Sequence, residues 1–301
     1  MRMMFIALCV ALILVISTAA GRAPHPHAKI KGLAFVRVNV SDLAVSRGFY
    51  ERNFQLGNHF NQCLATNSVC FRLSSSQSIE LVQAEVPPGG SFLEEVGFWT
   101  DDLEGLHHYL SAAGVSVGEI FTGYDDRKRF ELRDPENHRI AFVSDPLPGS
   151  FFTWATQLSR QLLHAGFVAN DLQAENHLYR DILSFRLYWQ GGFKDDGLDW
   201  YEIQVPNGHS WLEYMLNIPA TADRAELGVQ NHFSLGVKDI HATADQLRKN
   251  GLQKFDGPEI GRDGKWALDV YDPDGTRIEF MEFAPAQKPC CHPYTAGHPT
   301  P

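Results

Sequence analysis

The chain has 301 residues, a formal net charge of −10 and a hydrophobic fraction of 44%. This length exceeds that of a typical single domain and is sufficient for two hydrophobic cores. The acidic balance, without any block of basic residues, argues against nucleic acid or an anionic membrane as a partner.

The first 20 residues have the composition of a secretory signal peptide. Arg2 provides the positive start, residues 5–16 form an apolar centre, and residues 17–20 are the small side chains of a cleavage region. A membrane anchor is the alternative, but the apolar run is too short to span a bilayer comfortably. We therefore expect a cleaved signal, a secreted or periplasmic mature protein, and no membrane association after cleavage.

Four cysteines follow the predicted signal. Cys63 and Cys70 flank a short polar stretch and could bridge a hairpin, because an oxidising compartment permits disulfides; whether they are bridged stays open. Residues 286–301 form a Pro-rich tail that contains Cys290, Cys291 and His292. We expect this tail to be flexible and to bind metal weakly at most.

After a linker at residues 21–31, one unit occurs four times. Each copy opens with a strand, continues with an aspartate that caps an amphipathic helix, and ends in short aromatic and β-branched runs typical of a three-stranded meander. Gly114 and Gly251 stand where a left-handed residue would end a helix. The predicted unit is therefore β-α-β-β-β. The capping residues are Asp42, Asp102, Asp171 and Asp239.

The four units are nearly equal in length, since the capping aspartates are 60, 69 and 68 residues apart. One strand-helix-meander per unit suggests paired modules rather than a stacked array. We place the boundary between the second and third units at Pro146 to Trp154. The predicted fold is α+β, with an N-terminal domain at 32–148 and a C-terminal domain at 160–285.

The last unit ends in D-P-D-G-T-R-I-E, from Asp272 to Glu279, which predicts a tight turn followed by a strand. Paired β-α-β-β-β modules with a D-P-D-G-x-x-I-E ending resemble the vicinal oxygen chelate superfamily. That superfamily includes glyoxalase I, extradiol dioxygenases and bleomycin-resistance proteins. The resemblance covers about residues 32 to 283, and it implies that each pair of modules curls into a cleft.

The resemblance also implies ligand positions, because the first and last strands of each module contribute metal ligands in this superfamily. The first-strand position lies seven residues before the capping aspartate, and the last-strand position is the acid of the I-E pair. In the N-terminal half these positions hold Phe35, Glu80, Glu95 and Ala141. Phe and Ala cannot ligate a metal, so this half is predicted to be metal-free. In the C-terminal half they hold His164, Glu213, His232 and Glu279.

Two imidazoles and two carboxylates suit one divalent ion: Zn, Ni, Co, Mn or Fe. Coordination beyond four would let a small substrate chelate through two neighbouring oxygens, with the metal as Lewis acid. The resemblance implies that one carboxylate, Glu213 or Glu279, acts as general base, and the sequence does not decide between them. Elsewhere, Asn231, Arg262 and Lys265 could meet an anionic substrate, although the preferred interpretation of each is an exposed polar loop residue.

Three functions compete. The first is a lyase or isomerase of the glyoxalase I type, although export would remove it from cytosolic glutathione. The second is an extradiol-type dioxygenase that holds Fe(II) with His164, His232 and Glu279. Against it, Glu213 would be a surplus ligand, and Asp269 stands where that family has a tyrosine. The third is a non-catalytic protein that binds a small molecule. Substrate and oligomeric state stay open.

Overall fold

The computed structural model describes residues 29–57, 59–61, 67–85, 92–123, 125–144 and 157–301. The predicted signal, Cys63 and the predicted boundary at Pro146 to Trp154 lie outside these ranges, so their interpretation stays a prediction. Within the described part, no helix is long and apolar enough to cross a membrane.

The N-terminal half is one eight-stranded sheet with the strand order β2-β3-β4-β1-β5-β8-β7-β6. Its helices are α1 (Leu43–Phe54) and α2 (Leu103–Ala112). The strands are β1 (Ile30–Val40), β2 (His59–Asn61), β3 (Ser68–Arg72), β4 (Ser78–Gln83), β5 (Leu93–Thr100), β6 (Phe121–Thr122), β7 (Lys128–Arg133) and β8 (Arg139–Ser144). The first strand thus begins two residues before the predicted domain start.

The C-terminal half repeats this arrangement in a second sheet, with the order β10-β11-β12-β9-β13-β16-β15-β14. Its helical segments are α3 (Leu172–Asn176), which continues into the π-helix η1 (His177–Ile182), α4 (Arg224–Gln230) and α5 (Ile240–Lys249). The strands are β9 (Leu162–Val168), β10 (Arg186–Gly191), β11 (Trp200–Gln204), β12 (Trp211–Met215), β13 (His232–Val237), β14 (Asp256–Ile260), β15 (Trp266–Tyr271) and β16 (Arg277–Glu282). Helix α4 has no counterpart among the elements expected from the sequence.

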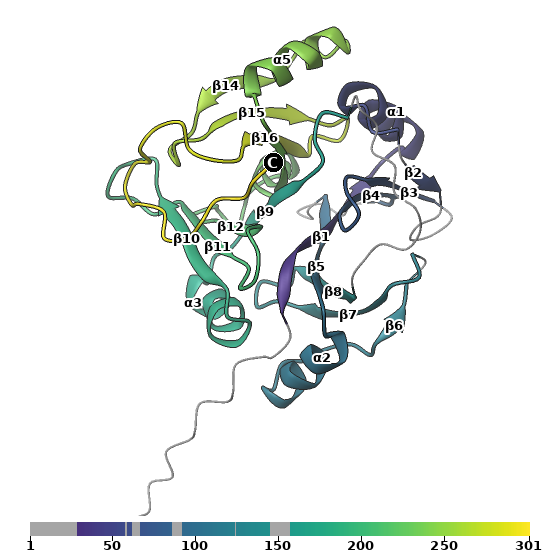
Figure 1. Ribbon diagram of the computed structural model, residues 1–301, viewed down its shortest axis with the longest axis vertical. Coiled ribbons are helices and arrows are strands. Elements are labelled where there is room, and N and C mark those ends of the chain that lie inside the picture. The colour runs from purple at the N-terminus through teal and green to yellow at the C-terminus, as the bar shows by residue number, and fades with distance from the viewer. Residues whose placement is uncertain (1–28, 58, 62–66, 86–91, 124, 145–156) are drawn as a thin grey trace, which may run out of the picture.

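In every module the first strand pairs in parallel with the last, and the last three strands form an antiparallel meander. The central strands of each sheet, β1 and β5 or β9 and β13, are antiparallel neighbours that join two modules. The predicted β-α-β-β-β unit and the α+β class are therefore confirmed. Figure 1 shows the two curved sheets side by side, with helices on their outer faces.

All four predicted capping aspartates cap their helices. Asp42 accepts from the backbone N–H of Ala44 and Val45, and the other three each accept one N–H near the start of the helix. These bonds satisfy donors that the first helical turn leaves unpaired. Gly114 and Gly251 have φ of 82° and 101°, the left-handed conformation expected after a helix.

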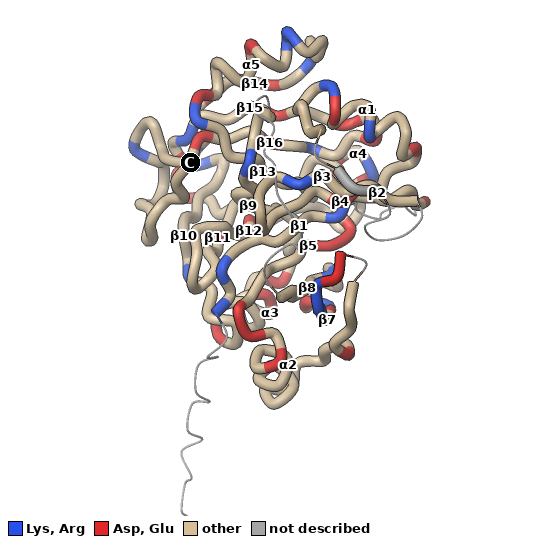
Figure 2. The backbone as a smooth tube through the Cα atoms, turned by 45° about the vertical axis from the view of Figure 1, so that its right-hand side comes forward, with Lys and Arg blue, Asp and Glu red and all other residues tan. Residues whose placement is uncertain are grey.

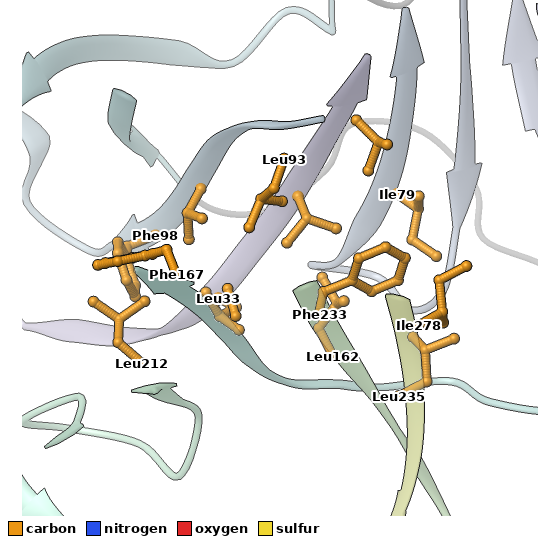
Figure 3. Packing of buried hydrophobic residues seen from close by; sticks show 14 of the residues in the cluster. Leu33, Ile79, Leu93, Phe98, Leu162, Phe167, Leu212, Phe233, Leu235 and Ile278 are labelled. Atoms are coloured by element: carbon orange, nitrogen blue, oxygen red, sulfur yellow. The ribbon is translucent and has the colours of Figure 1, made fainter. Parts of the chain in front are cut away.

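One hydrophobic core extends through both halves of the chain. Figure 3 shows Leu33 and Phe98 from the N-terminal sheet close to Leu162, Phe167 and other apolar residues of the C-terminal sheet. Modules one and four meet where the rings of Phe54 and Phe280 lie 5.1 Å apart. Because the two sheets share a core, we expect them to unfold as one cooperative unit.

The C-terminal tail is packed against the second sheet, so the expectation of a flexible tail is wrong. Thr295 donates its N–H to the Tyr188 carbonyl (2.9 Å), and the Tyr294 hydroxyl donates to Asp263 (2.9 Å). Aromatic side chains provide this anchoring, which the Pro-rich composition concealed. Cys290 and Cys291 are joined to each other in a disulfide and are therefore not free thiolate ligands.

Candidate metal centre

The four predicted metal ligands of the C-terminal half lie on the four central strands of its sheet. Two neighbouring rows of paired residues cross those strands, with one ligand at each end of each row. Alternation along the strands therefore directs all four side chains to one face of the sheet. The rows are Glu213–Gly166–His232 and His164–Ser234–Glu279.

Three of the side chains, those of His164, Glu213 and His232, offer ligand atoms within 4.8 Å of one another, and Glu279 lies beside them in contact with His164. The Nε2 atoms of His164 and His232 are 3.1 Å apart. Glu213 Oε2 lies 3.1 Å from His232 Nε2 and 3.7 Å from His164 Nε2, and Glu279 Oε2 lies 3.3 Å from His164 Nε2. The structure thus brings together the residues that the sequence placed at the ligand positions.

The protonation of this cluster fits a bound cation. Burial lowers the pKa of both imidazoles well below the usual value, so both rings are neutral at physiological pH. When His232 Nδ1 donates to the Gln230 carbonyl (2.9 Å), the lone pair on Nε2 is directed at the other ligands. Glu279 Oε2 and His164 Nδ1 have no hydrogen-bond partner among the described residues. Burial, and then the charge of Asp269, raises the pKa of the Glu279 carboxyl group well above its usual value, so this group ionises only with a cation beside it. Two neutral imidazoles and buried carboxyl groups that need a cation suit a divalent ion.

A glycine makes room for the second imidazole. A Cβ atom at Gly166 would lie 2.1 Å from Cε1 and 2.5 Å from Nδ1 of His232, well inside contact distance. The position opposite His232 therefore has to be free of a side chain. The other imidazole is held from the side, because the ring of Trp211 lies 4.9 Å from that of His164.

Arg277, on the same strand as Glu279, is a buried neighbour that the sequence analysis missed. Its Nη2 lies 2.9 Å from both ring nitrogens of His232, and its Nη1 lies 3.4 Å from Asp269 Oδ2. Its charge contributes to the low pKa of His232, after the larger effect of burial. Alternation from Glu279 by two residues could have placed Arg277 on the same face, and would have identified it.

Two of the weaker candidates have structural roles. Lys265 is fully buried, with Nζ 4.3 Å from the centre of the Trp211 ring and 3.3 Å from Asp263 Oδ2, so it does not face the cavity as suggested. Asn231 holds β9 to α4, because its side chain accepts from the Val168 N–H and donates to the Leu227 carbonyl. Arg262, in contrast, does line the cavity.

A cavity of about 340 Å³ opens over the cluster. Glu213 and Glu279 line its inner part, and aromatic and charged residues of β10, β11 and the β14–β15 region form its walls. This volume is large enough for a small organic molecule in contact with the ligand cluster. The outer lining residues include Trp189, Phe193, Trp200, Asp256, Glu259 and Arg262.

The N-terminal sheet has the same geometry with different side chains. Arg37 lies opposite both Glu80 and Glu95, the place that Gly166 has in the other sheet. Its guanidinium bonds Glu80 Oε2 at 3.2 Å and pairs with Glu95. Burial raises the pKa of Glu95 to about 7. In Figure 2, further basic and acidic residues adjoin around β7 and β8. A protein side chain thus supplies the cation in this half.

Comparison with known proteins agrees with this arrangement. The model of the Glyoxalase/Bleomycin resistance protein/Dioxygenase superfamily matches residues 32–142 and 161–280. The chain belongs to this superfamily. The match covers both halves, and it confirms the family recognised from the module pattern.

Among sequence relatives, the lactoylglutathione lyase of Haemophilus influenzae is 31% identical over 125 residues, which are 40% of this chain and 92% of that protein. A probable lactoylglutathione lyase of Synechocystis is 29% identical over 132 residues, 40% of this chain and 94% of that protein. Each relative therefore corresponds to less than half of this chain.

Solved structures resemble most of the chain, across both of its halves. The 2,3-dioxygenase LapB of Pseudomonas has a TM-score of 0.68 at 16% identity, covering 91% of this chain and 95% of its own. Homoprotocatechuate 2,3-dioxygenase of Brevibacterium fuscum has a TM-score of 0.64 at 17% identity, covering 86% and 82%. At such low sequence identity, the similarity shows the fold alone.

Proposed function

We propose that the chain is a metal-dependent lyase or isomerase that acts on a small substrate through two neighbouring oxygens. The observation that carries the proposal is the fourth ligand: Glu213 lies within 3.1 Å of His232 and 3.7 Å of His164, inside the cluster. A dioxygenase triad needs two histidines and one carboxylate and keeps the remaining positions open for substrate and oxygen. A fourth ligand instead suits chemistry without oxygen.

A divalent ion held by His164, Glu213, His232 and Glu279 would supply Lewis-acid stabilisation of negative charge on the substrate oxygens. The two carboxylates differ in their surroundings. Glu213 contacts both imidazoles, whereas Glu279 contacts one and leaves Oε2 without a hydrogen-bond partner among the described residues. We therefore assign the general base to Glu279, the carboxylate less engaged with the other ligands, and it takes a proton from the substrate carbon next to the chelating oxygens.

The test combines metal content with turnover. Metal analysis by plasma mass spectrometry should give about one ion per chain in the native protein and in Ala141→Glu, and much less in His164→Ala. Glu279→Gln should keep more metal than Glu213→Gln while losing at least about 100-fold in turnover of a hemithioacetal or a similar hydroxy-carbonyl compound. The absence of metal under every reconstitution condition would refute an enzyme of this type and leave a binding protein.

The dioxygenase is the second candidate, because the solved dioxygenases match most of the chain, across both of its halves. It predicts bound iron and consumption of dissolved oxygen when a catechol is added. The position three residues before Asp272 speaks against it, because Asp269 there is paired with Arg277 rather than free to serve a substrate. Iron as the native metal together with oxygen uptake would replace our proposal by this one.

We further propose that residues 1–20 direct export. The disulfide between Cys290 and Cys291 is the chemistry of an oxidising compartment, which supports this proposal. Glutathione adducts would then be scarce, and another substrate with vicinal oxygens is the better candidate. Sequencing the N-terminus of protein recovered outside the cytosol tests this: a start near residue 21 is expected, and an intact Met1 in the cytosol contradicts it.

A further inference from the structure

The cavity over the ligand cluster has two chemically different walls. Its lining includes residues of the two edge strands of the curved sheet, β10 and β14, and Figure 1 shows where these two strands lie. The wall on the β10 side is aromatic and consists of Trp189, Phe193 and Trp200. Phe193 is 77% exposed, and its ring lies 4.6 Å from that of Trp200. Trp200 is partly exposed, whereas Trp189 is buried in the wall. The accessible rings of Phe193 and Trp200 suit contact with a flat or a cationic group.

The opposite wall carries free carboxylates. Asp256 and Glu259 are exposed residues of β14 that line the cavity. Asp256 Oδ2 accepts a hydrogen bond from the Tyr271 hydroxyl at 3.1 Å. The described part of the chain places no Lys or Arg in an ion pair with either carboxylate. This wall is therefore negatively charged at physiological pH.

The rest of the lining does not neutralise that charge. Arg277 is paired with Asp269, and Arg262 donates to Asp195 and to the Gly192 carbonyl. The two carboxylates of the ligand cluster are balanced by the ion they would hold. Of the other acidic lining residues, Asp269 and Asp263 are paired with Arg277 and Lys265, and Glu202 is buried. The free negative charge of the cavity therefore lies at Asp256 and Glu259.

A buried carboxyl group deeper in the cavity has an oxygen atom that a polar ligand could bond. Glu202, on β11, is 1% exposed and lines the cavity, and its Oε2 has no hydrogen-bond partner among the described residues. The nearby Lys265 is engaged by Asp263, 3.3 Å away. A buried polar atom without a hydrogen-bond partner is costly unless a ligand or water supplies one.

We propose that this cavity selects a substrate in which a vicinal-oxygen group is joined to a positively charged group such as a protonated amine. The oxygens reach the metal ligands, and the ammonium lies between the aromatic rings and the carboxylates of Asp256 and Glu259. This inference rests on the proposed function. A substrate with a carboxylate in place of the ammonium would meet the surplus negative charge and bind more weakly.

Three probes with the same dihydroxyphenyl head test the inference: catechol, which is neutral, dopamine, which is cationic, and 3,4-dihydroxyphenylacetate, which is anionic. Binding to the full chain loaded with Zn²⁺, which is redox-inert, is measured by isothermal titration calorimetry. We expect dopamine to bind at least about 10-fold more tightly than the anionic probe, with a preference that shrinks as salt is added.

Substitution then assigns the preference to the two carboxylates. In Asp256→Asn/Glu259→Gln the preference for dopamine should fall to less than about threefold, while binding of neutral catechol changes little. Glu119→Gln, at an exposed acid of the N-terminal half, is the matched control and should leave the preference intact. The substituted positions are exposed, and the new side chains are nearly isosteric with the native ones, so folding is preserved.

The possible outcomes distinguish a failure of this inference from a failure of the proposed function. Equal or stronger binding of the anionic probe, or a cationic preference that survives the double substitution, overturns the inference while chelation by catechol still supports the proposed function. If none of the three probes binds to the zinc-loaded chain, chelation through vicinal oxygens itself is refuted, and the inference falls with it.

Discussion

Replacing Gly166 by alanine should weaken metal binding without removing a ligand. The new Cβ would lie 2.1 Å from His232 Cε1, whereas carbon atoms in ordinary contact are about 3.5–4.0 Å apart. The imidazole would therefore have to move by roughly 1.5 Å, and its Nε2 would leave the point shared with Glu213 and His164. Because mispositioned ligands typically cost about 10- to 100-fold in metal affinity, we expect a loss of about 1.4–2.8 kcal/mol in binding.

The assay is a competition titration against a chelator of known affinity. The control is Gly48→Ala, in helix α1, where a Cβ meets no atom within 4 Å. That substitution should leave metal affinity unchanged and stabilise the fold by up to about 1 kcal/mol, because alanine is the better helix former. Metal affinity within threefold of native in Gly166→Ala would refute the geometry of the centre.

Two further predictions concern buried charges. Arg37→Met leaves the carboxyl groups of Glu80 and Glu95 without their shared partner, so the free energy of unfolding in urea should fall by about 3–5 kcal/mol while metal content stays the same; an unchanged urea midpoint would contradict this. Burial, and then the charge of Asp134, raises the pKa of Glu175 to about 9. Between the ordinary pKa of a glutamic acid and this value, the folded chain keeps a proton that the unfolded chain has released. Stability should therefore decline as pH rises toward 9, by at most about 1.4 kcal/mol per pH unit, and Glu175→Gln should flatten urea midpoints measured between about pH 6 and about pH 9; parallel curves for both proteins would contradict this.

The elements that the sequence predicted depend on local chemistry. An aspartate before an apolar repeat caps a helix whatever surrounds it, so Asp42 and Asp239 could be assigned without tertiary information. Counting seven residues back from each cap located the strand positions. His232, which pairs with Gly166, and Glu95, which pairs with Arg37, occupy equivalent positions in the two sheets. Such counting works because a shift of one residue in strand register would move every side chain of the strand to the other face of the sheet.

The features that the sequence did not predict depend on contacts between distant segments. Arg37 follows Phe35 by two residues and so shares its face, but its role is visible only once Glu80 and Glu95 lie beside it. The burial of Lys265 depends in part on Tyr294, 29 residues further along the chain, whose ring lies 4.9 Å from the ammonium. No local sequence pattern in a Pro-rich tail predicts such a contact.

The packing of that tail has a consequence for how the protein behaves at high concentration. Strand β10 is an edge strand, and an exposed edge is a template for pairing with another chain. The tail lies along it (Figure 1), with Thr295 bonded to the Tyr188 carbonyl and the Trp189 indole bonded to the His292 carbonyl. The last residues thus protect the sheet from intermolecular strand addition, and a chain shortened before the tail would be prone to aggregate even though its metal ligands were intact.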